Sequence, residues 1–288
     1  MKITVTKGNR VTHADHDAPG GTESTNTVPT AASAGPQRAF TIPLTSLQRT
    51  ESMAPGGRME QLIGVGLYTP AEAGRLLHVS PAKISRWLRG HDRRGVRYDS
   101  LWAPQVELGD GKVYLGFRDL MEVRIADKFI GYGVSPQRIR AAIRLAREVL
   151  REDRPLSTDR FRTDGRDIFL RVVEKDEQGE ERERLLNLFR RQYEFKQIIE
   201  PLLKTIDFDD RGAPLQWWPL GKRGHIVVDP ARSFGQPIDS VTSVPTAVLA
   251  AAGRQESLAT AARIYEVPPA AIQRAMQFEA QMGLRAAV

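Results

Sequence analysis

The 288-residue chain contains no cysteine. This absence excludes disulfide bonds, thiol nucleophiles and thiolate metal sites, and it agrees with a reducing compartment. The sequence also lacks any run of about 18 apolar residues, the length that a membrane-spanning helix needs. Its N-terminus, Met1 to Val5, shows no apolar block of the kind found in signal peptides. We therefore expect a cytoplasmic protein that has no contact with a membrane.

Motifs for catalysis and metal binding are missing as well. The sequence has no glycine-rich phosphate loop, nucleophile elbow or metalloprotease helix, and its five histidines do not stand at metal-ligand spacing. Asp207, Asp209 and Asp210 form the best acidic cluster. Clustered carboxylates can bind magnesium, but they occur more often in exposed loops. We expect no enzyme activity, no cofactor and no metal.

Positive charge is in excess. The formal net charge is +7 and the isoelectric point is about 9.8, a balance that favours a polyanionic partner, most often nucleic acid. The simpler alternative is a soluble basic protein without such a partner. The hydrophobic content of 41% is ordinary for a globular protein, so the chain can bury a core.

The start of the chain has the composition of a disordered tail. Residues 6–57 are rich in Gly, Pro, Ser, Thr, Asn and Ala and show little apolar periodicity, so they cannot offset their own ordering entropy. Met53 and Met59 are candidate alternative translation starts, and the apolar patch at residues 40–44 is a candidate docking segment. We expect order to begin near Leu62.

Two successive helix starts predict a helix–turn–helix. Thr69-Pro70 begins the first helix, because threonine caps free N–H groups and proline fits the first helical position, and Glu72 completes a capping box. After a break, Ser80-Pro81 repeats the signal, and Gly90 ends the second helix. The apolar face of the second helix is Ile84, Trp87 and Leu88.

The other face of the second helix, with the segment after it, is polar and basic. The candidate DNA-binding residues are Ser80, Lys83, Ser85, Arg86, Arg89, Arg93 and Arg94. Lys83 and Arg86 lie near enough to the helix start to reach base edges in a major groove. The last three arginines are placed to hold phosphates. A hairpin predicted over Val106–Leu115, turning at Asp110-Gly111, would be the wing. The alternative is an ordinary helical hairpin with a solvated basic face.

This segment resembles a known family. The string Tyr68-Thr69-Pro70-x-Glu72-Ala73-x-x-Leu76-Leu77-x-Val79-Ser80-x-x-x-Ile84-x-x-Trp87 resembles the MerR-type winged helix-turn-helix, and Leu115-Gly116-Phe117-Arg118-Asp119-Leu120 resembles the segment that this family places after its wing. The family often has an arginine where this chain has Ser85, and the arginine here is Arg86. This departure leaves the individual base contacts open.

The chain after the wing is predicted to be mostly helical. A helix over Phe117–Ile130 is followed by one that starts at Ser135-Pro136. Thr158–Val173 is expected to form short strands around the turn Asp164-Gly165. The remaining expectations are a helix over Leu185–Ile206 broken at Pro201, a loop over Asp207–Pro219, and a strand at Ile226–Val228. Three further helices should start near Pro245, Ser257 and Pro268, with Val248, Leu258 and Tyr265 among their core positions.

The last quarter of the chain carries a second resemblance. The segment Val228-Asp229-Pro230-Ala231-x-Ser233-Phe234-Gly235-Gln236-Pro237-Ile238 resembles part of a small antitoxin domain that pairs with PIN-like ribonuclease toxins, as VapB-type antitoxins do. The same resemblance includes Val244-Pro245-Thr246, Ala261-x-x-x-Tyr265-x-Val267 and Ile272-x-x-Ala275-x-x-Phe278-Glu279. This resemblance implies an antitoxin that neutralises its toxin and represses its own operon.

The resemblances also imply partners. These are operator DNA, a cognate PIN-like ribonuclease toxin and a second copy of the chain in a homodimer. A basic side chain could distort the acidic magnesium site of such a toxin, and the candidates for this contact are Arg160, Arg162, Arg166, Arg223 and Arg232. The alternative function is a stand-alone MerR-like regulator with a ligand-sensing C-terminal half.

The expected fold class is mainly α with small β-hairpins, combining an N-terminal winged helix-turn-helix with a C-terminal three-helix domain. The expected divisions are a tail (1–57), the DNA-binding domain (62–155), a connecting region with short strands and a helix (156–222) and the antitoxin domain (223–283).

Overall fold

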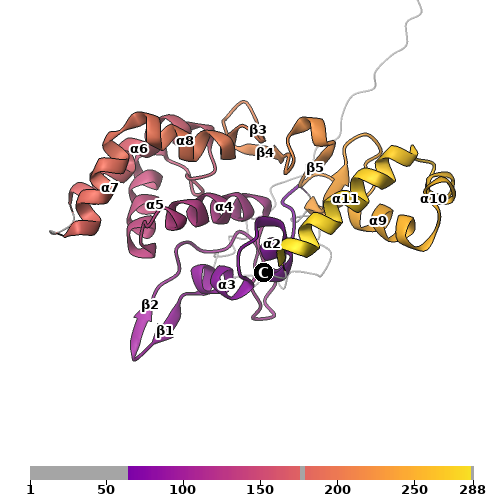
Figure 1. The fold of residues 1–288 in the computed structure, drawn as a ribbon. Coiled ribbons are helices and arrows are strands. Elements are labelled where there is room, and N and C mark those ends of the chain that lie inside the picture. The colour runs from indigo at the N-terminus through magenta and orange to yellow at the C-terminus, as the bar shows by residue number, and fades with distance from the viewer. Residues whose placement is uncertain (1–63, 176–178, 287–288) are drawn as a thin grey trace, which may run out of the picture. The chain divides into compact units, whose positions relative to one another are not determined.

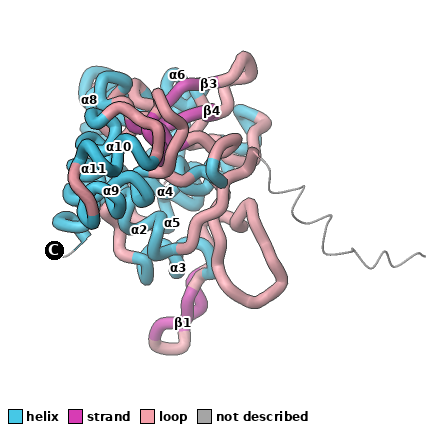
Figure 2. Tube along the Cα trace, turned by 90° about the vertical axis from the view of Figure 1, so that its right-hand side faces the viewer, coloured by secondary structure: helices cyan, strands magenta, loops and turns pink. Residues whose placement is uncertain are grey.

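The computed structural model describes residues 64–175 and 179–286. Within these ranges lie ten α-helices, two short 3-10 helices and two small antiparallel sheets (Figures 1 and 2). The fold class, mainly α with small β-hairpins, is therefore confirmed. The predicted tail, the docking segment at residues 40–44 and the start of order near Leu62 lie outside the described residues. No helix in the described ranges is long and apolar enough to cross a membrane.

Two short helices, a hairpin and two longer helices make up the first part. They are α2 (Pro70–Leu77), α3 (Pro81–Arg89), β1 (His91–Arg93), β2 (Val96–Tyr98), α4 (Phe117–Gly131) and α5 (Pro136–Leu150). Helix α4 ends one residue beyond its predicted range, and α5 starts where predicted. Ser135 caps α5, since its hydroxyl accepts from the backbone N of Arg138 at 3.5 Å.

The strand prediction for Thr158–Val173 is wrong. This segment is helix α6 (Asp159–Glu174), which Thr158 caps by accepting from the backbone N of Phe161 at 3.3 Å. Gly165, interpreted as a turn residue, lies inside the helix against the Phe161 ring, where an added Cβ would come within 2.8 Å of the ring. The glycine thus allows close packing and makes no turn.

The helix predicted over residues 185–206 is present, but its start and its break lie at other residues than predicted. The segment 185–206 is divided into α7 (Glu180–Arg190) and α8 (Gln192–Leu203), and the break falls at Arg191, whose backbone is extended, and not at Pro201. The expected loop over Asp207–Pro219 contains strand β4 (Pro214–Trp217), which pairs with β3 (Ile206–Phe208). Strands β5 (Ile226–Val228) and β6 (Pro237–Asp239) complete a four-stranded sheet whose order follows the sequence.

Five phenylalanines form the centre of the large hydrophobic cluster. They come from four helices and are Phe129, Phe161, Phe169, Phe189 and Phe195, all 2% exposed or less. The ring centroids of Phe129 and Phe169 lie 4.4 Å apart, and those of Phe169 and Phe189 lie 5.0 Å apart in a stacked arrangement. Aromatic packing of this kind adds to the burial of apolar area, and it holds α4, α6, α7 and α8 together.

The C-terminal part follows the prediction in its elements and departs from it in its core. Helices α9 (Thr246–Gln255), α10 (Leu258–Ile264) and α11 (Pro269–Ala286) start close to the predicted positions and enclose their own apolar cluster. However, Val248, Leu258 and Tyr265, predicted to be in the core, are 38%, 40% and 39% exposed. The helical spacing placed them near the core, but no described element covers this face.

A polar network links α11 to the first helix of the helix–turn–helix. The guanidinium of Arg75 on α2 lies 2.7 Å from the carboxylate of Glu279 on α11. The second carboxylate oxygen of Glu279 accepts from the hydroxyl of Thr246, a buried residue, at 2.5 Å. Because the Glu279 side chain is only 8% exposed, both partners are needed to compensate its burial.

Two buried carboxylates on α4 hold the surrounding loops. Asp119 is fully buried and accepts from Trp102 Nε1 at 3.1 Å, from the backbone N of Gln105 at 2.6 Å and from Arg154 Nε at 2.6 Å. One turn later, Glu122 accepts from the backbone N of Ser157 at 2.8 Å. Burial raises the pKa of Glu122 from 4.5 to about 7.

This raised pKa predicts a pH-dependent stability. The folded state keeps the Glu122 proton up to about pH 7, whereas the unfolded chain releases it near 4.5. The stabilising contribution is therefore complete below pH 4.5 and is lost as the pH rises through 7. We expect Glu122→Gln to be more stable than the wild type at pH 8, by roughly 3 kcal/mol at most, and to match it at pH 4.5. Urea unfolding at both pH values measures this, and an equal difference at the two would contradict the assignment.

Candidate nucleic-acid interface

The turn between α2 and α3 is fixed by capping and by one glycine. Thr69 and Glu72 form the predicted capping box: the Thr69 backbone N donates to the Glu72 carboxylate at 2.8 Å, and the Glu72 backbone N donates to the Thr69 hydroxyl at 3.2 Å. An added Cβ on Gly74 would lie 2.5 Å from the carbonyl oxygen of Val79. The absence of this Cβ allows the chain to turn closely back into α3.

Helix α3 has one buried and one open side. Ile84, Trp87 and Leu88 are buried, as predicted. Ser80, Arg86 and Arg89 are exposed and Ser85 is half-buried, so these residues form an outward stripe. Within the described ranges, the side chain of Arg86 has no hydrogen-bond or ion-pair partner. Arg89 donates to the carbonyl of Gly111.

Lys83 differs from the rest of the predicted set. Its ammonium lies 2.7 Å from the carboxylate of Asp127 on α4 and 4.9 Å from the centre of the Trp87 ring. These contacts turn the side chain towards α4 and away from the outward stripe. To meet a base, Lys83 would first have to leave Asp127.

The regular hairpin lies earlier than the predicted wing. Strands β1 and β2 pair directly after α3, with Arg94 and Gly95 in a two-residue turn at φ 51° and 78°. The predicted hairpin over Val106–Leu115 is reduced to a single bridge between Val106 and Tyr114. The missed signal is Gly95 as the second residue of a tight turn, a typical choice in two-residue hairpins.

The hairpin is braced against α3. The rings of His91 and Tyr98 stack with centroids 4.9 Å apart. Arg97 lies 2.9 Å from Asp92 and donates to the backbone carbonyl of Arg89 at 3.1 Å. The candidates Arg93 and Arg94 belong to this hairpin, Arg93 in β1 and Arg94 exposed in the turn. Six of the seven candidates from Ser80 to Arg94 therefore lie on the outward stripe of α3 or on the hairpin.

A groove of about 400 Å³ lies between α3, the hairpin and α5. Arg86, His91 and Arg140 contribute to its lining. Arg140 donates to the backbone carbonyls of Asp99 and Ser100 and thereby fixes the chain that leaves β2. The sequence analysis did not single out Arg140, because its role depends on a contact across 40 residues.

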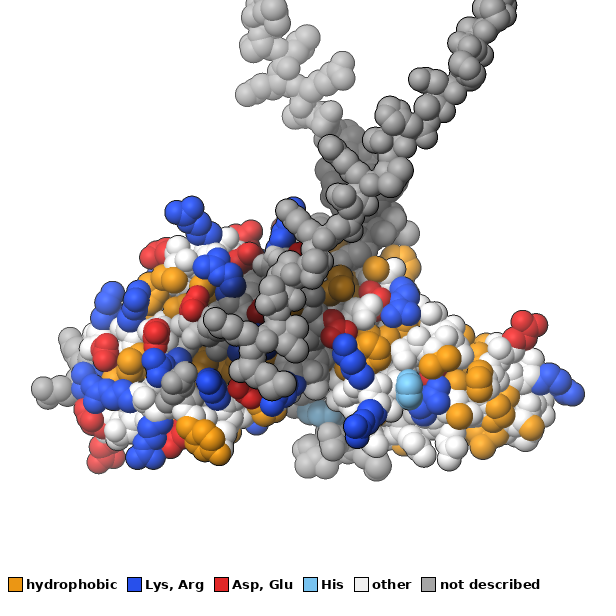
Figure 3. Space-filling view, turned by 90° about the horizontal axis from the view of Figure 1, so that it is seen from above, with side chains coloured by type: hydrophobic (Ala, Val, Ile, Leu, Met, Phe, Trp, Pro, Cys, Tyr) orange, Lys and Arg blue, Asp and Glu red, His pale blue; other side chains and the backbone are white. Residues whose placement is uncertain are grey.

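The excess positive charge is concentrated in this part of the chain. Residues 64–155 contain 17 lysines and arginines against 11 acidic residues, whereas residues 156–288 contain 19 of each. On the face that Figure 3 shows, apolar side chains gather over the end of the molecule that α9, α10 and α11 form. The excess positive charge and these exposed apolar side chains thus belong to different parts of the described chain.

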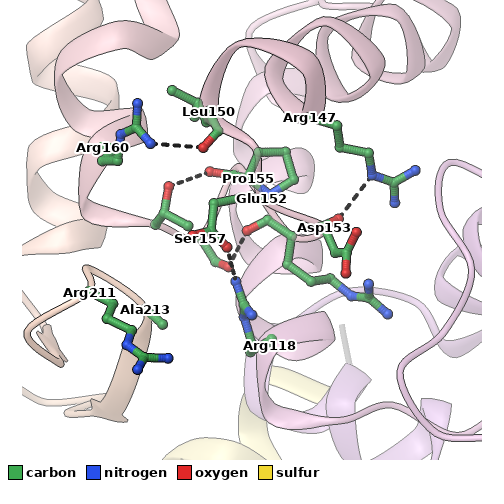
Figure 4. Close-up of polar contacts among 12 residues, drawn as sticks. Arg118, Arg147, Leu150, Glu152, Asp153, Pro155, Ser157, Arg160, Arg211 and Ala213 are labelled. Carbon is green, nitrogen blue, oxygen red and sulfur yellow. Dashed lines mark hydrogen bonds and ion pairs between the residues drawn. The ribbon is translucent and has the colours of Figure 1, made fainter.

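The five residues predicted to contact a toxin fall into two groups. Arg160, Arg162 and Arg166 lie on α6, and Arg223 and Arg232 flank strand β5. Most of them have structural partners: Arg160 donates to the carbonyl of Leu150 at 2.8 Å (Figure 4), and Arg232 lies 2.7 Å from Asp229. Arg162 and Arg166 pair with neighbouring aspartates of α6. Of these five side chains, Arg223 alone is exposed and has no hydrogen-bond or ion-pair partner among the described residues.

The acidic cluster at residues 207–210 is used locally. Asp209 accepts from the backbone N of Arg211 and Ala213 at 3.0 and 2.8 Å, which closes the β3–β4 turn. Asp207 accepts from Trp218 Nε1 at 2.8 Å and lies 2.7 Å from Lys222. Among the described residues, no group of three or more His, Asp or Glu side chains could hold a metal ion.

These features define a mainly helical protein with a basic helix–turn–helix and hairpin and a charge-balanced helical C-terminal part. No family model matches the chain. The chain is 29% identical over 197 residues to a protein of Mycobacterium tuberculosis (strain ATCC 25618 / H37Rv) named "Putative antitoxin VapB45", covering 65% of this chain and 82% of that protein. A crystal structure of Rv2018 from Mycobacterium tuberculosis is similar as well, with 25% identity and a TM-score of 0.59, over 74% of this chain and 99% of that one.

The junction between α3 and the hairpin yields a second prediction. Gly90 has φ +72°, and an added Cβ would collide with the carbonyl oxygen of Tyr98. Gly95 has φ +78° but nothing within 4 Å of an added Cβ. We expect Gly90→Ala to lower the free energy of unfolding by about 2–4 kcal/mol and Gly95→Ala by about 1 kcal/mol, because only the first adds a collision to the backbone strain. Urea unfolding of both variants measures the difference, and equal losses would refute it.

Proposed function

We propose that this chain is the antitoxin of a type II toxin–antitoxin pair. In this proposal it binds and neutralises a PIN-like ribonuclease toxin in the cytoplasm, represses its own operon by binding operator DNA, and catalyses no reaction. The observation that carries the proposal is the 29% identity over 197 residues to a protein whose name designates an antitoxin. The resemblance of residues 228–279 to an antitoxin domain agrees with it.

The geometry of α3 supports the DNA-binding half of the proposal. Arg86 and Arg89 project from the outward stripe of a helix whose other side is buried, and a major groove admits one such helix. Arg94 stands at the tip of the adjacent hairpin, where it can reach the phosphate backbone. The surplus of six positive charges in residues 64–155 supplies the non-specific attraction. DNA readers of this kind usually bind palindromic sites as two-fold dimers, so we propose a homodimer.

Arginine substitutions test the DNA contact. We expect Arg86→Ala to weaken binding to the duplex upstream of the protein's own gene by roughly 5- to 150-fold, the range of a specific base contact. Arg94→Ala should weaken operator and unrelated duplexes alike and lower the salt dependence of log Kd by about one unit of slope. Fluorescence anisotropy at several salt concentrations measures both effects.

Arg190→Ala is the matched control, because Arg190 is exposed on α7, outside the basic segment. It should leave the affinity for both duplexes unchanged. If all three variants bind like the wild type, the helix–turn–helix is not the DNA contact.

Toxin neutralisation is tested by co-expression. The product of the neighbouring gene, if it is a small ribonuclease, should arrest growth when expressed alone. Co-expression of this chain should restore growth and yield a complex that survives purification. A toxic neighbour that is neither bound nor neutralised would contradict the proposed function.

A further inference from the structure

The turn between β5 and β6 has an unusual backbone. Ser233, Phe234 and Gly235 are three consecutive residues at positive φ, with values of 47°, 53° and 81°. Only glycine adopts this region without cost, and a bulky residue there is a clear outlier. Phe234 therefore occupies a position at which its own backbone is strained.

The side chain of Phe234 adds a second cost. It is 51% exposed although it is large and apolar. Asparagine or glycine at this position would relax the backbone and remove apolar surface from water. Contacts of the Phe234 ring within the described part of the chain offset neither the backbone strain nor the exposure, since the ring lies in no described aromatic pair or apolar cluster. Strained residues of this kind are concentrated at functional sites.

The turn is nevertheless held firmly. The Gly235 backbone N donates to the Arg232 carbonyl at 2.9 Å, and the Gln236 N donates to the Ser233 carbonyl at 3.0 Å. The segment before α2 adds two long-range bonds: the Leu67 backbone N donates to the Phe234 carbonyl at 3.0 Å, and the Tyr68 hydroxyl donates to the Gly235 carbonyl at 2.7 Å. A ring presented on such a rigid turn loses little entropy when it enters a pocket.

We propose that the turn Ser233–Gln236 is a docking point for the toxin, with Phe234 as an aromatic anchor that enters an apolar pocket on that protein. This inference rests on the proposed function and assigns it a contact. Exposed aromatic anchors dominate the energetics of many protein interfaces. Residues 223–283 contain five basic and five acidic residues, a balance that suits a protein surface better than a nucleic acid.

This proposed docking point differs from the toxin contact predicted from the sequence, which consisted of arginines. Arg232, next to the turn, is held by Asp229 at 2.7 Å and by the Ser243 hydroxyl at 3.1 Å. It therefore shapes the base of the turn, while Phe234 meets the partner. The contact is apolar at its centre and needs no displacement of a metal ion.

The test uses Phe234→Asn in the full chain, with the neighbouring ribonuclease as the binding partner. Asparagine tolerates positive φ, so the thermal midpoint of the free chain should stay the same or rise. The affinity for the toxin, measured by titration calorimetry, should fall at least tenfold. A residue with a merely structural role would lower the midpoint, so the two readouts separate the cases.

Val241→Asn is the matched control, because Val241 is 64% exposed in the same part of the chain at an ordinary φ. It should bind the toxin like the wild type. Equal binding by the wild type and Phe234→Asn would overturn this inference alone, and so would a change confined to the oligomeric state of the free chain. Absence of binding by the wild type would overturn the proposed function and this inference with it.

Discussion

The arrangement of the basic half depends on one buried charge. The Asp119 carboxylate, fully buried at the start of α4, takes hydrogen bonds from Trp102, Gln105 and Gly116 and an ion pair from Arg154. These partners belong to the chain that returns from the hairpin and to the loop that leads into α6. Losing one partner of a buried charge costs about 3–5 kcal/mol. The hairpin, α4 and α6 therefore keep their relative positions because this carboxylate must stay satisfied.

Contacts outside the predicted DNA-binding residues also fix the geometry of the candidate interface. Arg140 donates to the backbone carbonyl of Ser100 just after β2, and Arg97 donates to the backbone carbonyl of Arg89 at the end of α3. Because Gly90 has no Cβ, the end of α3 can approach the carbonyl of Tyr98 at the end of β2. None of these three residues is among the predicted DNA contacts, yet together they set the angle between α3 and the hairpin. On the outward stripe, Arg89 donates to the Gly111 carbonyl, whereas Lys83 lies off the stripe and is held by Asp127.

The sequence predicted best where the signals were local. Caps at Thr69 and Ser135, the paired helix starts and the buried face of α3 depend on residues within one or two turns, and all are present. Prediction from the sequence failed where the role of a residue depends on how the elements pack against one another. Gly165 was interpreted as a turn residue because the sequence alone does not reveal that it packs against the Phe161 ring. Val248 was interpreted as a core residue because helical spacing does not reveal that no neighbouring helix covers it. The strain at Phe234 leaves no trace in a single sequence, because phenylalanine is rarely expected at positive φ.

The bond from Tyr68 to Gly235 has a consequence for biosynthesis. Its two ends are 167 residues apart, and those of the Arg75–Glu279 pair are 204 apart. A ribosome adding about 5–20 residues per second needs roughly 8–40 seconds to pass from the first residue of either pair to the second. During this interval the helix–turn–helix exists without the contacts that complete its first helix. These two contacts form only when nearly all of the described chain has been translated, so premature termination would leave Tyr68 and Arg75 without their partners.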